Sequence, residues 1–151
     1  MITIEESTLF NAPIDAVFDA ERNISLHSAT QAHRGERAVA GITQGLIEDG
    51  QEVEWEAVHF GIRQRMRTRI AGMEKPVFFR TVLVFGAFKS FTHDHVFKPL
   101  GDGRTEKLDV MKLEAPLGIL GWLAERLFLK AYMTAFLRRK NAELAELINP
   151  K

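Results

Sequence analysis

Two neighbouring stretches of the sequence alternate strictly between charged and uncharged residues. Glutamates stand at positions 52, 54 and 56, and arginines at positions 63, 65, 67 and 69. A period of two places alternate side chains on opposite faces of a β-strand, so the charges of each stretch share one face. A two-residue turn at Phe60-Gly61 would then set three opposite charges across the strands: Glu56 with Arg65, Glu54 with Arg67, and Glu52 with Arg69. This complementarity predicts an antiparallel hairpin in one register.

The two faces of this hairpin have different expected environments. The charged face is predicted to be solvated, where ion pairs contribute little free energy of folding. The other face must then point into the protein. Its residues are Val53, Trp55, Ala57, His59, Ile62, Gln64, Met66, Thr68 and Ile70.

The order of the remaining elements indicates an α+β protein. A first strand is expected at 2–10, and two short helices follow at 13–22 and 24–32. Further strands are expected at 36–40, 52–60, 62–72, 77–85, 87–100 and 105–114, before a long helix at 116–149. Consecutive strands with segregated helices are typical of α+β folds. An antiparallel sheet has one buried face, and only the long helix can cover it.

The long C-terminal helix is apolar on two sides, whereas a surface helix usually has one apolar stripe. We expect the first side to cover the sheet: Leu120, Ala124, Leu127, Phe128, Ala131 and Ala135. The second side is expected to lie under the N-terminal helices, or to contact a second copy, a protein partner or a membrane surface: Trp122, Leu129, Met133, Phe136 and Leu137. Charges at Glu125, Arg126 and Lys130 argue against a membrane span.

Composition excludes several classes of protein. The formal net charge is zero, so nothing indicates nucleic-acid binding. The absence of cysteine excludes disulfides, thiol nucleophiles and thiolate metal sites. We expect a single domain over residues 1–151, which is long enough for a sizeable core, and a cytoplasmic protein.

Three segments carry a resemblance to a known family. They are FNAPIDAVF at 10–18, GLIEDGQEVEWEA at 45–57 and GAFKSFTHDH at 86–95. With the order of elements, they resemble the Bet v 1/START-like (SRPBCC) superfamily, in particular its bacterial polyketide cyclase/dehydrase-like and cell-division inhibitor-like members. The resemblance implies a helix-grip fold, in which a seven-stranded antiparallel sheet surrounds the C-terminal helix and a cavity that often holds an apolar ligand. It implies no single reaction, so the site must decide the function.

A histidine pair lies on one of the predicted strands. Alternation places His93 and His95 on the same face as Phe91 and Phe97, which we expect to point inward. A His-x-His pair can bind zinc or iron when a third ligand approaches, and Asp109 is a candidate. We nevertheless predict no metal and no cofactor, because the pattern is weakly specific and the family it resembles is not generally metal-dependent.

Three functions follow from these patterns. The favoured one is binding of a small apolar or amphipathic molecule, of lipid, quinone or polyketide type, in a cavity under the helix. The expected lining residues are Trp55, His59, Gln64, Met66, Phe79, Phe91, His93, His95, Phe97, Leu120, Leu127 and Phe128. The second is a cyclase or dehydratase that uses His93, His95 or His59 to transfer protons. The third is a protein- or membrane-interaction module that uses the second side of the helix, through Trp122, Leu129, Met133 and Phe136.

Overall fold

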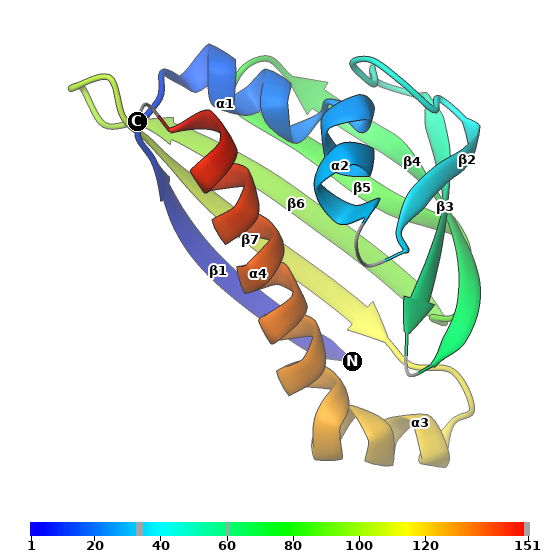
Figure 1. The fold of residues 1–151 in the computed structure, drawn as a ribbon. Coiled ribbons are helices and arrows are strands. Elements are labelled where there is room, and N and C mark those ends of the chain that lie inside the picture. Colours follow the sequence, from blue (N-terminus) through cyan, green and yellow to red (C-terminus); the bar gives the residue numbers. More distant parts are fainter. Residues whose placement is uncertain (33–34, 60, 150–151) are drawn as a thin grey trace.

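Seven strands form one antiparallel sheet in the computed structural model, which describes residues 1–32, 35–59 and 61–149. The strand order is β1-β7-β6-β5-β4-β3-β2, so only β1 and β7 pair across a long stretch of sequence. The sheet curves around one side of the C-terminal helix (Figure 1). The strands are β1 (Ile2–Phe10), β2 (Arg37–Gly41), β3 (Glu52–His59), β4 (Ile62–Glu74), β5 (Phe78–Phe85), β6 (Ser90–Pro99) and β7 (Thr105–Glu114).

The helices complete the predicted α+β helix-grip architecture. Two short helices follow β1, and a long helical segment follows β7. That segment includes a π-turn, in which the helix is wider than an α-helix. The helical elements are α1 (Ile14–Glu21), α2 (Ile24–Gln31), α3 (Ile119–Ala124), the π-turn η2 (Glu125–Leu129) and α4 (Lys130–Ile148).

The hairpin of β3 and β4 has the predicted register. Glu52 lies opposite Arg69, and His59 lies opposite Ile62 at the closed end. The predicted turn includes Phe60, which lies outside the described residues. Ile62 pairs with His59 and so shares its face of the sheet, but it is 62% exposed rather than enclosed by the protein as we expected. It is the first residue of β4, so its side chain lies at the end of the strand.

The outer face of this hairpin differs from the solvated surface that we expected. Glu54 and Glu56 are buried, although they lie on the charged side of β3. Arginine side chains from neighbouring strands cover their carboxylates, and Glu56 contacts Arg37, Arg63 and Arg65. The charged face therefore forms a connected ion-pair network rather than separate exposed pairs.

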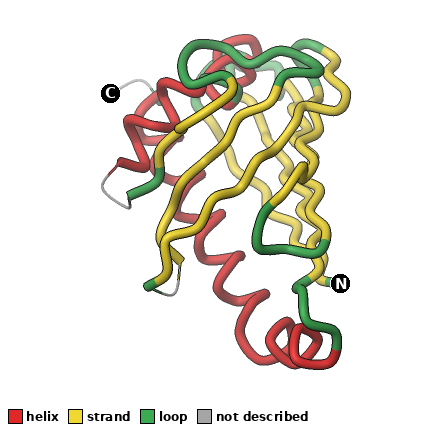
Figure 2. The backbone as a smooth tube through the Cα atoms, turned by 90° about the vertical axis from the view of Figure 1, so that its right-hand side faces the viewer, coloured by secondary structure: helices red, strands yellow, loops and turns green. Residues whose placement is uncertain are grey.

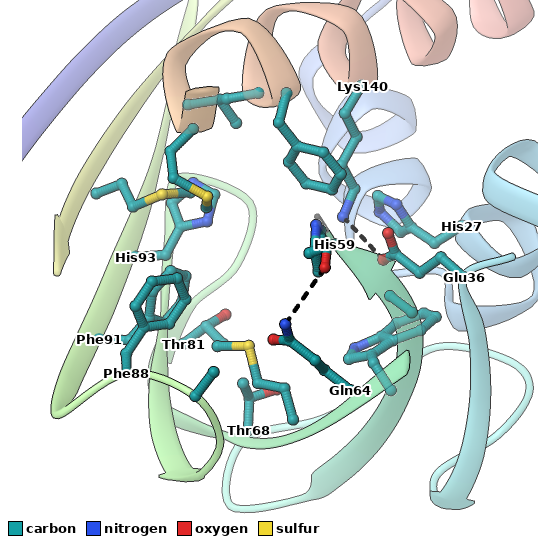
Figure 3. Close-up of a pocket in the computed structure, with 18 of the residues that line it drawn as sticks. His27, Glu36, His59, Gln64, Thr68, Thr81, Phe88, Phe91, His93 and Lys140 are labelled. Atoms are coloured by element: carbon teal, nitrogen blue, oxygen red, sulfur yellow. Dashed lines mark hydrogen bonds and ion pairs between the residues drawn. The ribbon is translucent and has the colours of Figure 1, made fainter. Parts of the chain in front are cut away.

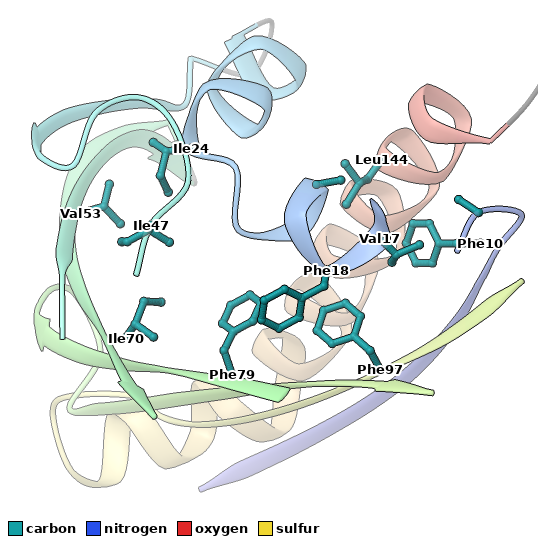
Figure 4. Packing of buried hydrophobic residues seen from close by; sticks show 12 residues of the cluster. Phe10, Val17, Phe18, Ile24, Ile47, Val53, Ile70, Phe79, Phe97 and Leu144 are labelled. Carbon is teal, nitrogen blue, oxygen red and sulfur yellow. The ribbon is translucent and has the colours of Figure 1, made fainter. Parts of the chain in front are cut away.

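Short helices α1 and α2 close one end of the sheet. Phe18 of α1 inserts between Phe79 and Phe97, with ring centroids 5.6 and 5.3 Å away (Figure 4). Ile47 of the loop before β3 joins this hydrophobic cluster, and Leu144 of α4 joins it from the helix side. A second hydrophobic cluster joins β1, β6 and β7 to the first half of α4. The middle of the inner sheet face lies between these two clusters.

The side of the C-terminal helix that covers the sheet is opposite to our prediction. Leu129, Met133 and Leu137 are buried against the sheet, whereas we expected them to lie under the N-terminal helices or to face a partner. Leu120 and Leu127, predicted to face the sheet, are 67% and 75% exposed. Figure 2 shows α4 running along the concave side of the sheet, with the shorter α3 turned across its lower end.

The reason for this reversal is the spacing of the inward residues. They recur every four residues and include two polar members: Gly121, Glu125, Leu129, Met133, Leu137 and Asn141. In a regular α-helix such a row drifts by about 40° at each step. The wider π-turn removes part of this drift and keeps the row on the sheet side. Within the described residues, no helix is long and apolar enough to cross a bilayer.

Candidate functional site

A cavity of about 400 Å³ lies between the inner sheet face and the C-terminal helix. This volume is within the usual range for small-molecule sites. Figure 3 shows His93 and Phe91 on one wall, and His59 and Gln64 on the other. Aromatic and aliphatic side chains form most of the remaining wall, including Trp55, Met66, Phe88, Met111, Met133 and Phe136.

Most of the residues that we expected to bind a ligand line this cavity. They are Trp55, His59, Gln64, Met66, Phe79, Phe91, His93, His95 and Phe128. Three others are placed elsewhere, so these predictions are wrong. Phe97 is buried in the core beside Phe18, because α1 covers that end of the sheet. Leu120 and Leu127 are exposed, because they lie on the outer side of the helical segment.

The wall around His59 carries polar groups that can orient a ligand. Its Nδ1 lies 2.7 Å from the Tyr132 hydroxyl, and the Gln64 side-chain amide donates to the His59 carbonyl oxygen at 3.5 Å. Burial lowers the pKa of His59 below its ordinary value, so the ring is neutral at neutral pH. Glu36 and Lys140 approach within 3.8 Å at the same side of the cavity (Figure 3).

A buried ionic cluster lies behind the opposite wall. The Lys107 ammonium is 2.9 Å from Glu21 Oε1 and 3.1 Å from Asp109 Oδ1, and it donates to Asn141 Oδ1 at 2.9 Å. The Asn141 amide in turn donates to Asp109 Oδ2 at 2.8 Å. Lys107 and Asp109 are fully buried. Each charge is tolerable there because an opposite charge and an amide are its neighbours.

Electrostatics within this cluster keep both carboxyl groups ionised. Burial is the largest single influence and opposes ionisation, but the Lys107 ammonium and the neighbouring histidines together outweigh it and hold the pKa of Glu21 and of Asp109 well below their ordinary values. For Lys107 itself, burial is outweighed by Asp109 and Glu21, which raise its pKa. The cluster therefore contains two carboxylates and one ammonium at neutral pH.

His93 connects the cluster to the cavity. Its Nε2 lies 2.7 Å from Asp109 Oδ1. Because an ionised carboxylate only accepts hydrogen bonds, Nε2 must carry the proton and donate. In the neutral form of this ring the lone pair is then on Nδ1, and the described residues form no hydrogen bond with Nδ1. Since His93 lines the cavity, this arrangement presents a carboxylate-oriented base to a bound molecule.

His95 differs from His93 although both were candidates for proton transfer. It stacks between Phe79 and His93, with ring centroids 4.1 and 3.8 Å away. Burial and then the neighbouring His93 lower its pKa to about 3. Its Nδ1 makes no hydrogen bond within the described part of the chain. His95 is therefore a neutral structural ring at neutral pH, and His93 is the better-placed base.

His93, His95 and Asp109 form the group of donors that could hold a metal ion. Their ligand atoms lie within 4.8 Å of one another, so the candidate third ligand does approach the histidine pair. The same Asp109 oxygen already accepts from His93 and contacts Lys107. A cation at this point would have to displace the Lys107 ammonium from its carboxylate, which makes a metal site unfavourable.

The sequence patterns missed several residues of the site. Glu21, Lys107 and Asn141 belong to the ionic cluster, and Tyr132 contacts His59. Alternation along β7 did carry a signal, because Lys107 shares the odd-numbered face with Met111 and Leu113. Tyr132 and Asn141 could be predicted as site residues only if the side of the helix that faces the sheet were known. The pattern of apolar residues indicated the wrong side.

Comparison with known proteins supports the fold. No family model matches the sequence, and no curated protein matches it. Among solved structures, the chain is similar to TTHA0849 from Thermus thermophilus, with a TM-score of 0.73, 16% identity, and coverage of 98% of this chain and 100% of that chain. It is also similar to ginseng major latex-like protein 151 from Panax ginseng, with a TM-score of 0.71, 12% identity and coverage of 99% and 98%.

A START superfamily protein from Mycobacterium smegmatis is also similar, with a TM-score of 0.69, 16% identity, and coverage of 96% of this chain and 98% of that chain. At such low identities the likeness is one of fold, and it extends over almost the whole chain in each case. The chain therefore has the helix-grip fold of the Bet v 1/START-like (SRPBCC) superfamily.

Proposed function

We propose that this protein binds a small hydrophobic or amphipathic molecule, of lipid, quinone or aromatic polyketide type, in the cavity. The observation that carries the proposal is the cavity itself, about 400 Å³ with predominantly apolar walls. Apolar walls around a space of this size would gain van der Waals contacts with an apolar molecule that fills it. The polar groups of His59 and His93, on opposite walls, would bond to a carbonyl or hydroxyl group of the ligand.

Filling the cavity is expected to abolish binding. The probe is N-phenyl-1-naphthylamine, whose fluorescence rises in apolar surroundings. Ala57 lines the cavity on β3, and in Ala57→Phe the added ring would occupy the space of the probe, so we expect at least about tenfold weaker binding. Fatty acids and quinones are then tested as competitors.

The matched control is Val58→Phe. Val58 is the next residue of β3 and is exposed on the other face, so the same ring added there leaves the cavity unchanged. We expect wild-type affinity for this variant, and folding of both variants is checked by circular dichroism. Equal probe affinity in wild type, Ala57→Phe and Val58→Phe would contradict binding in the cavity.

A second candidate function, proton transfer on the bound molecule, is favoured by the His93–Asp109 pair. In such a step the His93 Nδ1 lone pair takes a proton from the carbon beside a ligand carbonyl. The C–H electron pair moves into the enolate, and the imidazolium formed is stabilised by Asp109. In a cyclisation the enolate carbon would attack a second carbonyl carbon of the same molecule, and the alkoxide formed would take the proton from the imidazolium. In a dehydration the enolate would expel a β-hydroxyl group, which would take that proton and leave as water. Both are reactions of the type that the sequence resemblance implies.

Exchange of enolisable protons tests this candidate. With β-tetralone as probe in deuterium oxide, we expect NMR to show faster exchange with wild type than with buffer. His93→Phe or Asp109→Asn should lower the protein-dependent rate by about a hundredfold, the low end of general-base contributions. Asp94→Asn, on the outer face of β6, is the control and should not change the rate. An unchanged rate in His93→Phe would leave binding alone as the function.

A further inference from the structure

The helical segment after β7 exposes an unusual number of large apolar side chains. Within residues 117–128, Ile119 is 79% exposed and Trp122 is 49% exposed. Figures 1 and 2 both show α3 beyond the ends of the strands, away from the rest of the sheet. The apolar side chains, hereafter the outer patch, are Leu117, Ile119, Leu120, Trp122, Leu123, Leu127 and Phe128. Contiguous exposed apolar surface of this kind usually marks an interaction site.

Contacts on the inner side of the helical segment fix the orientation of the outer patch. At Gly121 a Cβ atom would lie 1.9 Å from the Pro116 carbonyl oxygen, so only glycine permits this close approach. One turn later, the Glu125 carboxylate is buried, with one oxygen 2.7 Å from the Met1 amine and the other accepting a hydrogen bond from the Ala115 amide. These contacts hold one side of the segment on the sheet and direct the apolar side outward.

The exposed charges that the helical segment itself carries have a single sign. In residues 117–139 the one acidic residue is Glu125, which is buried, while every exposed charged residue is cationic. These cations are Arg126, Lys130, Arg138 and Arg139, of which Arg138 is paired with Glu6 of β1 at 2.9 Å. They line one surface groove together with Leu127 and Phe128. Because the whole chain has no net charge, this is a local separation of charge and not a consequence of composition.

Apolar residues with a tryptophan and a cationic border are the combination found in helices that lie in the membrane interface. The Arg126 guanidinium lies 4.3 Å from the centroid of the Trp122 ring, so a polar and an apolar group meet at one edge of the patch. We propose that the outer patch docks the protein on a lipid bilayer that contains anionic phospholipids. The apolar side chains would enter the interface, and Arg126, Lys130 and Arg139 would meet phosphate headgroups.

The same charges disfavour a second copy of this chain as the occupant. A twofold dimer contact places the same surface on both sides of the interface. Arg126 and Lys130 of one copy would then approach the cations of the other, at a cost in free energy. An anionic bilayer satisfies both the apolar and the cationic parts of the surface.

Docking would bring the ligand cavity to the membrane, a consequence that rests on the proposed binding function. Phe128 lines the cavity and is also half exposed in the outer patch. Ala124, one turn earlier, is a second residue of this segment that lines the cavity. An apolar molecule could then pass between bilayer and cavity without crossing water, which makes the ligand one that resides in membranes.

Sedimentation with vesicles tests the docking. We expect wild type to bind phosphatidylcholine vesicles that contain phosphatidylglycerol, and to bind pure phosphatidylcholine vesicles much more weakly. Leu120→Glu with Leu127→Glu should weaken binding at least about tenfold, because two charges would enter the interface. Val84→Glu with Leu147→Glu changes the charge equally at exposed apolar sites elsewhere, and should bind as wild type does.

The contribution of the cations to vesicle binding is tested separately, with a double variant that combines Arg126→Gln and Lys130→Gln. Since each cation near an anionic surface contributes about fivefold, the double variant should bind about thirtyfold more weakly to vesicles with phosphatidylglycerol. Equal vesicle binding by the Leu120/Leu127 and Val84/Leu147 variants would overturn the proposal. The proposal would also be overturned if wild type did not bind vesicles and instead formed a concentration-dependent dimer that the Leu120/Leu127 variant could not form.

The two proposals fail in different ways. The Leu120/Leu127 variant should keep wild-type affinity for N-phenyl-1-naphthylamine in the absence of vesicles. Conversely, Ala57→Phe should keep vesicle binding while losing the probe. Vesicle binding without probe binding therefore supports docking and rejects the cavity function, and probe binding without vesicle binding does the reverse.

Discussion

Replacement of Lys107 by methionine is expected to lower the free energy of unfolding by about 3 to 5 kcal/mol. Methionine has a similar length and no charge, so Glu21 and Asp109 would be left buried without their shared ammonium. Asn141 would also lose the donor to its side-chain oxygen. Urea denaturation at neutral pH, followed by circular dichroism, measures the change.

Lys112→Met provides the matched control on the same strand. Lys112 is exposed on the other face of β7, where loss of a charge should change stability by less than about 0.5 kcal/mol. If the two variants unfold at the same urea concentration, the buried ionic cluster does not stabilise the fold as we infer.

This cluster also illustrates what the sequence could not reveal. Alternation on β7 places Lys107 and Asp109 inward, yet lysine is rarely buried, and the pattern alone offers no reason to accept it there. The reason lies in Glu21 of α1 and Asn141 of α4, which are distant in the sequence. No local pattern reports that four such residues meet.

The sheet, by contrast, was predictable in detail from local patterns. The hairpin register follows from residues no more than 17 positions apart, since Glu52 pairs with Arg69. Charge complementarity and alternation both favour this one register, and a slip by one residue would reverse the faces of every side chain. His93 and His95 were placed on the inner face by the same alternation, and both line the cavity.

The prediction of the buried side of the C-terminal helix is wrong because it rests on apolar content alone. The side with more apolar residues is exposed, and the buried side includes Glu125 and Asn141. Both polar residues find partners from other elements, the Met1 amine for Glu125 and Lys107 for Asn141. A helix whose two sides are both apolar therefore cannot be oriented from its own sequence. The exposed side is the more informative one, since burial does not explain its composition.

Mild acid is expected to destabilise the protein through its buried histidines. Burial, with the neighbouring Lys140, lowers the pKa of His27 to about 4, and burial with His93 lowers that of His95 to about 3. In the unfolded chain both rings have ordinary pKa values of about 6.5. Between these values the unfolded state binds more protons, so stability falls as the pH decreases.

The magnitude follows from about 1.4 kcal/mol per pH unit for each ring. From pH 7 to pH 5 each histidine should therefore cost about 2 kcal/mol, or about 4 kcal/mol together. Glu21 and Asp109 do not contribute to the change in stability between pH 7 and pH 5. Their pKa values are lowered, so their contribution is present above the unfolded values of about 4 and is lost only at lower pH. Urea denaturation at the two pH values measures the difference.

His95→Phe should remove about half of this pH dependence, because phenylalanine can still stack on Phe79 and does not titrate. The relevant quantity is the difference between pH 7 and pH 5 within each variant, which cancels any uniform loss of stability. Thr92→Phe, on the outer face of β6, should retain the full wild-type difference. If the stability of His95→Phe changed between pH 7 and pH 5 as much as that of wild type, the His95 ring would be protonated in the folded protein. Our inference that a neutral His95 stacks beside the proposed base, His93, would then be wrong.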